Sequence, residues 1–175
     1  MQGPPRVAEV ACWSHVRRGF FDEWAAHKSA IAKQALDRIG VLFDIERPIK
    51  GQPPDVRRAV RQQAARPKID ELADWLDEQL KKLPGKSGLA GAIRYARSRW
   101  SALTRYLDDG RLEISNNAAE NQIRPAALGR KNWLFCGSDA GGQRAADFYT
   151  LVRTARLNGV ELEAWLTDVI ARIGA

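Results

Sequence analysis

The stretch Ile69-Asp-Glu-Leu-Ala-Asp-Trp-Leu-Asp-Glu-Gln-Leu-Lys-Lys-Leu83 carries the clearest structural signal in this chain of 175 residues. Its apolar residues recur every three or four positions, the period of a helix that buries one face. Acidic side chains lie near its start and two lysines near its end, which complements the helix dipole. Pro67 suits the first helical turn, and Pro84-Gly85 ends the pattern. The stretch therefore predicts a long amphipathic helix.

The same period on both sides of this stretch predicts a mainly α-helical chain. A proline-rich break at 48–54 separates a first helical run from a short, polar, arginine-rich segment at 55–65. Ser87 is a candidate helix cap, Pro125 is expected to interrupt a helix, and Asn158-Gly159 is a candidate helix end. The expected helical stretches are 15–45, 67–83, 88–107, 117–128, 140–158 and 162–173.

The N-terminal residues 7–12, Val-Ala-Glu-Val-Ala-Cys, predict a short buried strand. A lone strand leaves backbone groups unpaired, so this one calls for other strands beside it. The sequence thus indicates part of a larger α/β fold.

Composition excludes some classes of protein. Hydrophobic residues make up 45% and charged residues 28%, a globular balance. No apolar run reaches the roughly 18 residues of a membrane span, and no signal peptide is evident, so we expect a cytoplasmic protein without membrane contact. The net charge of +7 favours a polyanionic partner such as DNA, although it also keeps proteins soluble.

Basic residues concentrate between Gln79 and Leu107, where seven cations and no acid occur. Arg94, Arg97 and Arg105 are expected near one helix face, where they would contact phosphates; the alternative is a solvated face. Farther on, Gly129-Arg-Lys-Asn-Trp133 joins two cations to an aromatic ring. We assign Arg130 and Lys131 to DNA and the ring to the core.

Two further patterns have competing interpretations. Cys12, His15, His27 and Cys136 are potential zinc ligands, but their spacing favours a small core cysteine at position 12. The stretch 138–142, Ser-Asp-Ala-Gly-Gly, suits either a phosphate at a helix start or an ordinary N-cap.

Glu120 also has two interpretations from the residues alone. Asn117-x-x-Glu120 is a capping-box pattern, with the asparagine as N-cap. The residues Asn117, Glu120 and Arg124 also share one helical face, which sets a carboxylate between an amide and a guanidinium.

Several long motifs together resemble the C-terminal part of the insertion sequence 66 family of transposases. The main one runs Gly110-Arg-Leu-Glu-Ile-Ser-Asn-Asn-Ala-Ala-Glu-Asn-Gln-Ile-Arg-Pro125 and continues to Gly142. The motifs Cys12-Trp-Ser-His-Val-Arg-Arg-Gly-Phe20, Arg66-Pro67-Lys68, Tyr106-Leu-Asp-Asp-Gly110 and Thr154-Ala-Arg-Leu-Asn-Gly159 fit the same family in the same order. Asn121, Ser115 and Gly19 depart from the family pattern.

The resemblance implies a ribonuclease-H-like fold and DNA strand cleavage and transfer of the DDE type. Such enzymes hold two Mg²⁺ ions with three acids, and Glu120 matches the third acid, supported by Asn116 and Asn117. Arg124 joins the DNA-binding cations. The family's two aspartates precede the Cys12 motif, and none of Met1–Ala11 is aspartate. We therefore expect a fragment that is inactive on its own.

The expected organisation follows from this resemblance. Residues 1–12 would be the last strand of the ribonuclease-H-like core and 13–107 a helical insertion. Residues 108–158 would carry the catalytic-glutamate helix and return to the core, and 159–175 would form a C-terminal helix. The expected partners are transposon-end DNA and full-length transposase or further copies of the chain. The alternative function is a non-enzymatic DNA-binding or regulatory fragment.

Overall fold

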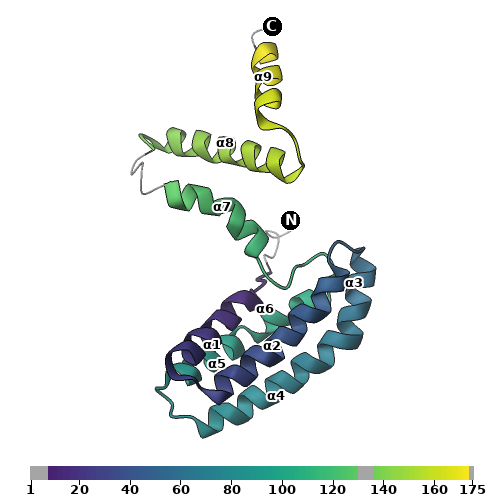
Figure 1. Cartoon of the computed structure of the whole chain (residues 1–175), viewed down its shortest axis with the longest axis vertical. Helices are drawn as coiled ribbons and strands as arrows, with labels where there is room; N and C mark the ends of the chain where they lie inside the picture. The colour runs from purple at the N-terminus through teal and green to yellow at the C-terminus, as the bar shows by residue number, and fades with distance from the viewer. Residues whose placement is uncertain (1–7, 130–135, 174–175) are drawn as a thin grey trace, which may run out of the picture. The chain divides into compact units, whose positions relative to one another are not determined.

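The computed structural model describes residues 8–129 and 136–173 and divides the chain into two units, 1–116 and 117–175. The described part is mainly α-helical, as predicted (Figure 1). The first unit contains α1 (Trp13–His27), α2 (Ala30–Ile49), α3 (Pro54–Val60), the π-helical turn η1 (Arg61–Ala65), α4 (Arg66–Lys82), α5 (Gly88–Ser98), α6 (Trp100–Thr104) and the 3-10 turn η2 (Arg105–Leu107). The second contains α7 (Asn117–Gly129), α8 (Asp139–Leu157) and α9 (Leu162–Ile173).

The first helical run is two helices rather than one. Lys28 adopts a left-handed conformation with φ 50° and ends α1. Ser29 then caps α2, because its hydroxyl accepts a hydrogen bond from the Ala32 amide at 3.3 Å. Apolar spacing persists across this turn, so periodicity alone predicts one continuous helix where the chain makes a hairpin of two.

The predicted central helix is confirmed as α4, and its apolar stripe forms part of the core. Ile69, Leu72 and Leu76 are buried in one core cluster with residues of α1, α2 and α5. Trp13 of α1 is fully buried, and its indole nitrogen donates to the Leu103 carbonyl at 2.9 Å. The core of the first unit therefore joins its N-terminal helix to its last helical turns.

The predicted N-terminal strand is wrong for the residues that the structure describes. Residues 8–12 form no strand, and none occurs elsewhere in the described ranges; Val7 lies outside them. A strand requires a neighbouring strand to satisfy its backbone groups. The Ala11 amide instead donates to the Ala102 carbonyl, and the Trp13 amide to the Ile114 carbonyl, each at 3.1 Å. The few short strands expected in the fold are thus absent from the described chain.

The arginine-rich segment before α4 is helical and buries one of its faces. After a turn in which Gly51 has φ 80°, α3, η1 and α4 follow one another without interruption. Arg57 and Arg61 are both buried within this stretch. Two arginines of the polar segment 55–65 are therefore buried.

The second unit has the predicted helices but buries few of their side chains. The Ser138 hydroxyl caps α8 by accepting from the Gly141 amide at 3.0 Å, and Gly159 follows the helix with φ 67°. The helix α7 runs through Pro125 rather than stopping there. Ala155 is the one residue of this unit's described part that is buried. Large apolar side chains stay exposed, among them Ile123, Leu128, Phe148, Leu151, Leu157 and Ile170.

Truncating Leu76 tests the core of the first unit. Leu76 is 0% exposed, so Leu76→Ala should lower the free energy of unfolding by about 2–5 kcal/mol through lost burial and a residual cavity. Urea unfolding followed by circular dichroism measures this loss. Val41→Ala, at a site 42% exposed, is the control and should change little. A loss from Leu76→Ala no larger than the control's would show that the stripe is not packed in solution.

Candidate functional site

A buried ion pair holds the last part of the first unit, which precedes Glu120 in the sequence. Arg61, at the start of η1, is 0% exposed. Its Nε and Nη2 donate to the two carboxylate oxygens of Glu46 on α2, each at 2.7 Å. Its Nη1 donates to the carbonyl of Tyr106 at 2.9 Å and to that of Asp109 at 3.3 Å. One guanidinium thus connects α2, η1 and the segment 106–109.

Neighbouring side chains on the same helical stretch hold the rest of this segment. Arg57 Nη2 donates to the Leu112 carbonyl at 3.3 Å and pairs with Glu113 at 2.8 Å. Gln62 donates to the Leu107 carbonyl at 2.8 Å. Arg66 pairs with Asp108 at 2.5 Å. We call Arg57, Arg61, Gln62 and Arg66 the arginine clamp.

We call residues 106–114 the clamped segment. It contains a glycine, Gly110, that no other residue can replace unless the neighbouring backbone moves. Gly110 is buried, and a Cβ there would collide with the backbone of Pro54 at the start of α3. On the exposed side of the same turn, the Asp109 carboxylate accepts hydrogen bonds from Arg111. These bonds lower the pKa of Asp109 to about 2. The buried side of the turn is therefore fixed by steric fit, and its exposed side carries an ion pair.

Tyr106 lies against the clamp and completes the buried polar cluster. The Arg61 guanidinium lies 5.0 Å from its ring centroid. Burial, and then the negative charge of Glu46, raise the pKa of the Tyr106 hydroxyl above its ordinary value. This hydroxyl and the Nε of Arg57 are buried without a hydrogen-bond partner in the described part of the chain. The cluster is thus tightly enclosed but not fully satisfied.

Glu120 lies in the first turn of α7, the first helix of the second unit. It is exposed, as are Asn116, Asn117 and Arg124. The helix begins at Asn117. Ile114 is buried in the first unit, so the clamped segment ends two residues before Asn116. The predicted catalytic and supporting residues therefore directly follow the clamp in sequence.

The Glu120 carboxylate is a suitable oxygen ligand for Mg²⁺, but the described residues do not form a complete metal site. Mg²⁺ prefers several oxygen ligands in octahedral geometry. No group of three or more His, Cys, Asp or Glu side chains converges within residues 8–129 and 136–173. Of the candidate zinc ligands, Cys12 is buried in the first unit, whereas His15, His27 and Cys136 are exposed.

The predicted DNA-binding cations have different environments. Arg97 makes two hydrogen bonds of 2.7 Å to Asp77 and lies over the Trp100 ring, and Arg105 donates to the Glu9 carbonyl at 2.6 Å. Arg94 is exposed, with no acidic partner among the described residues. Arg130 and Lys131, with Trp133, lie outside the described residues. Arg94 and Arg124 are the exposed members of the predicted set.

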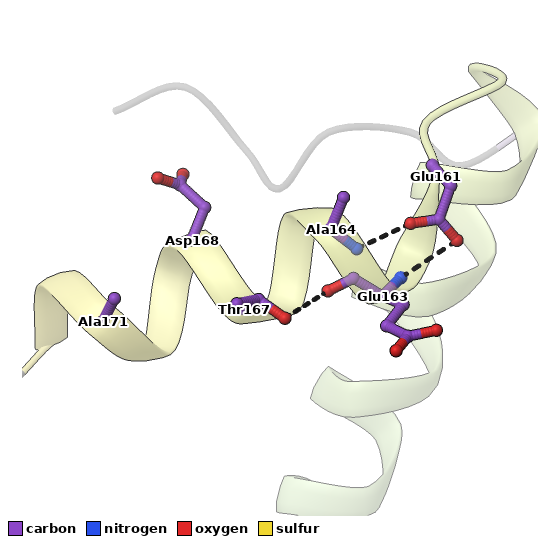
Figure 2. Close-up of a pocket in the computed structure, with 6 residues that line it drawn as sticks. All are labelled: Glu161, Glu163, Ala164, Thr167, Asp168 and Ala171. Carbon is purple, nitrogen blue, oxygen red and sulfur yellow. Dashed lines mark hydrogen bonds between the residues drawn. The ribbon is translucent and has the colours of Figure 1, made fainter.

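A pocket of about 540 Å³ beside α9 has the wrong charge for DNA (Figure 2). Its polar lining includes Glu161, Glu163 and Asp168. The Glu161 carboxylate accepts from the amides of Glu163 and Ala164, at 3.3 and 2.6 Å, and so caps the helix. This pocket is a feature of the helix start rather than a candidate site.

Comparison with known proteins identifies the family. The model of the family described as Transposase IS66 family matches residues 2–144, which include the Cys12 motif, the clamped segment and Glu120. The chain belongs to the IS66 transposase family. The resemblance found in the sequence is thereby confirmed.

The IS66-family chain also resembles curated proteins of Sinorhizobium fredii. It is 40% identical to the uncharacterized protein y4hP over 93% of this chain, and 39% identical to the uncharacterized protein y4qI over 94%. These alignments cover 32% and 30% of the two relatives, so the chain spans about a third of their length. No solved structure matches the chain significantly. No helix in its described part is long and apolar enough to cross a membrane.

The arginine clamp was not predicted from the sequence, although a signal for it exists. Glu46 falls on the buried face of α2, four residues after Leu42 and three before Ile49. An acid at a core position of an amphipathic helix requires a buried cationic partner, because an unpaired buried charge is costly. The arginines of residues 55–65 were the available partners in this IS66-family chain.

Breaking the clamp should destabilise the first unit. Arg61→Met leaves Glu46 buried without its bidentate partner, so the free energy of unfolding should fall by about 3–5 kcal/mol. Arg111→Met removes an exposed arginine from the same turn and should have little effect. The double variant Arg61→Met, Glu46→Leu should recover part of the loss. Equal stability of Arg61→Met and Arg111→Met in urea unfolding would contradict a buried pair.

Proposed function

We propose that this chain is part of a DDE-type DNA transposase in which Glu120 is the third catalytic acid. The family match that includes Glu120 carries the proposal. In the intact protein, a ribonuclease-H-like core would supply the other two acids, and the enzyme would cleave and transfer DNA strands with two Mg²⁺ ions. The exposure of Glu120 supports this role, because a catalytic carboxylate must reach its substrate.

The position of Arg124 relative to Glu120 suits binding of a phosphodiester next to the acid. Arg124 lies one helical turn beyond Glu120, so both side chains leave α7 on the same face. An exposed guanidinium there can contact a phosphate one helical turn from the acid. Ile114, three residues before α7 begins, is still held in the first unit, because its carbonyl accepts from the Trp13 amide.

The proposed partners are DNA and further transposase chain. The charge of +7 supports DNA, since basic proteins gain affinity by releasing phosphate counterions. The exposed apolar residues of α7 and α8, including Ile123 and Leu157, support protein contact, because a unit that buries so little apolar surface needs further packing. Since the chain spans about a third of its relatives, the remaining transposase is the partner we propose for these residues.

The first test concerns catalysis. The 175-residue chain alone should not nick DNA in the presence of Mg²⁺, because one carboxylate cannot hold two ions in fixed geometry. In a full-length relative, the Glu→Gln change at the position matching Glu120 should abolish strand transfer. In the present chain, Glu120→Gln should leave the melting temperature nearly unchanged. Nicking by the chain alone that is lost in Glu120→Gln would disprove the fragment proposal, and an active full-length Gln variant would disprove the assignment of Glu120.

The second test concerns duplex binding. The chain should bind duplex DNA weakly, with an affinity that falls steeply as salt rises. Arg94→Ala should weaken binding and lower the salt slope by about one phosphate contact. Arg47→Ala is a matched control, since this exposed arginine already pairs with Asp44 at 2.8 Å. Identical salt slopes for Arg94→Ala and the unmodified chain, measured by fluorescence anisotropy, would remove Arg94 from the interface.

A further inference from the structure

A groove of about 470 Å³ between α1 and α5 of the first unit shares no lining residue with the clamp. Small residues line it, including Gly19, Gly91 and Ala92. A Cβ at Gly19 would come within 3.7 Å of the Ala92 Cβ, so the two helices approach closely beneath the groove. A Cβ at Gly91 would meet no atom within 4 Å, so the groove is open above this glycine.

The groove has one basic end and one acidic end. The helices α1 and α5 are antiparallel, because Gly19 faces Ala92 while Glu23 lies against Gly88. His15 and Arg18 therefore lie toward Tyr95, and the two acids of the groove, Asp22 and Glu23, lie toward Gly88. An anionic ligand would bind at the Tyr95 end.

At this basic end, an aromatic ring and a cation form a stacked pair. Tyr95 lines the groove and is 42% exposed. The Arg99 guanidinium lies 4.3 Å from the Tyr95 ring centroid. Arg94 and Arg18 are exposed, with no acidic partner in the part of the chain that the structure describes. Arg94 lies on α5 three residues after Gly91 and next in sequence to Tyr95, which lines the groove.

We propose that this groove binds single-stranded DNA, with an unpaired base stacked on the Tyr95 and Arg99 pair and the phosphates held by Arg18 and Arg94. The inference rests on the proposed function, since it assumes that DNA is the polyanion this chain meets. Stacking on an aromatic ring beside cations is how proteins bind single strands without sequence preference. The open space above Gly91 gives the base room to enter.

The same geometry favours a single strand over a duplex. In a duplex, each base face is covered by its neighbours, so a surface tyrosine reaches only edges and phosphates. A flat ring at the edge of a groove instead matches the exposed face of an unpaired base. Duplex binding through Arg94 would need only phosphate contacts and is independent of the Tyr95 ring.

Binding of fluorescein-labelled oligodeoxythymidylate to the whole chain, followed by anisotropy, tests the proposal. Tyr95→Ala should weaken single-strand binding roughly 5- to 150-fold, the effect of losing one stacked base. Tyr95→Phe should retain it, because the ring remains. Gly91→Glu, which places a carboxylate in the groove without a clash at Cβ, should abolish single-strand binding. Circular dichroism confirms that each variant is folded.

Gly40→Glu is the matched control. Gly40 is also a helical glycine whose Cβ would meet nothing within 4 Å, and it lines a different groove on α2. It should bind oligodeoxythymidylate as the unmodified chain does. The proposal is overturned if Tyr95→Ala binds normally, if Gly40→Glu loses as much affinity as Gly91→Glu, or if the chain does not bind the oligomer. Loss of duplex binding alone would instead count against the proposed function, so the two failures are distinguishable.

Discussion

The buried ion pair between Arg61 and Glu46 is the constraint on which the first unit depends. Charges inside a protein lose their hydration, and only a nearly complete set of partners offsets that cost. Glu46 receives two hydrogen bonds from Arg61, and Arg61 gives its remaining ones to carbonyls of the segment 106–109. Moving α2 or η1 would break the buried pair, and moving the segment 106–109 would leave Nη1 of Arg61 without its acceptors. The conformation of the family motif Tyr106–Gly110 is therefore fixed by α2 and η1, far from it in sequence.

The arginines of this network lie on the same helical stripe as the apolar core. Arg57, Arg61, Ala65, Ile69, Leu72 and Leu76 follow one another at spacings of three or four and are all buried. Periodicity predicted the apolar half of this stripe correctly. It missed the other half because a charged residue is assigned to solvent by default, although a long guanidinium can be buried when acceptors surround it. The acceptors here are mainly backbone carbonyls, which a sequence pattern does not reveal. Periodicity also missed the turn at Lys28 that separates α1 from α2. The apolar residues keep their spacing of three and four across this turn, so the pattern shows no break.

The second unit shows another limit of prediction from the sequence. Its three helices were predicted from the same periodicity, and their caps at Ser138 and Gly159 are confirmed. An amphipathic pattern predicts that a face will be buried but not what buries it. The described part of this unit covers little of those faces, and the chain spans about a third of its relatives. Glu120 shows the same limit for the site. Spacing alone left capping and catalysis open, and the catalytic interpretation comes from long motifs in a fixed order, which the family match confirms only at the level of the family.

Net charge is a poor guide to where this chain would meet DNA, because many of its arginines neutralise acids within the fold. Arg61 is paired with Glu46, Arg66 with Asp108, Arg97 with Asp77 and Arg111 with Asp109. Each such pair has no net charge, so its arginine contributes little to the long-range attraction of DNA. The attraction must come from cations without a nearby acid. In the first unit these include Arg18, Arg94 and Arg99, all at the same end of the helix pair α1 and α5. A phosphate approaching this unit would therefore be drawn to cations such as these rather than to Arg57, Arg61 and Arg66, which are paired within the fold.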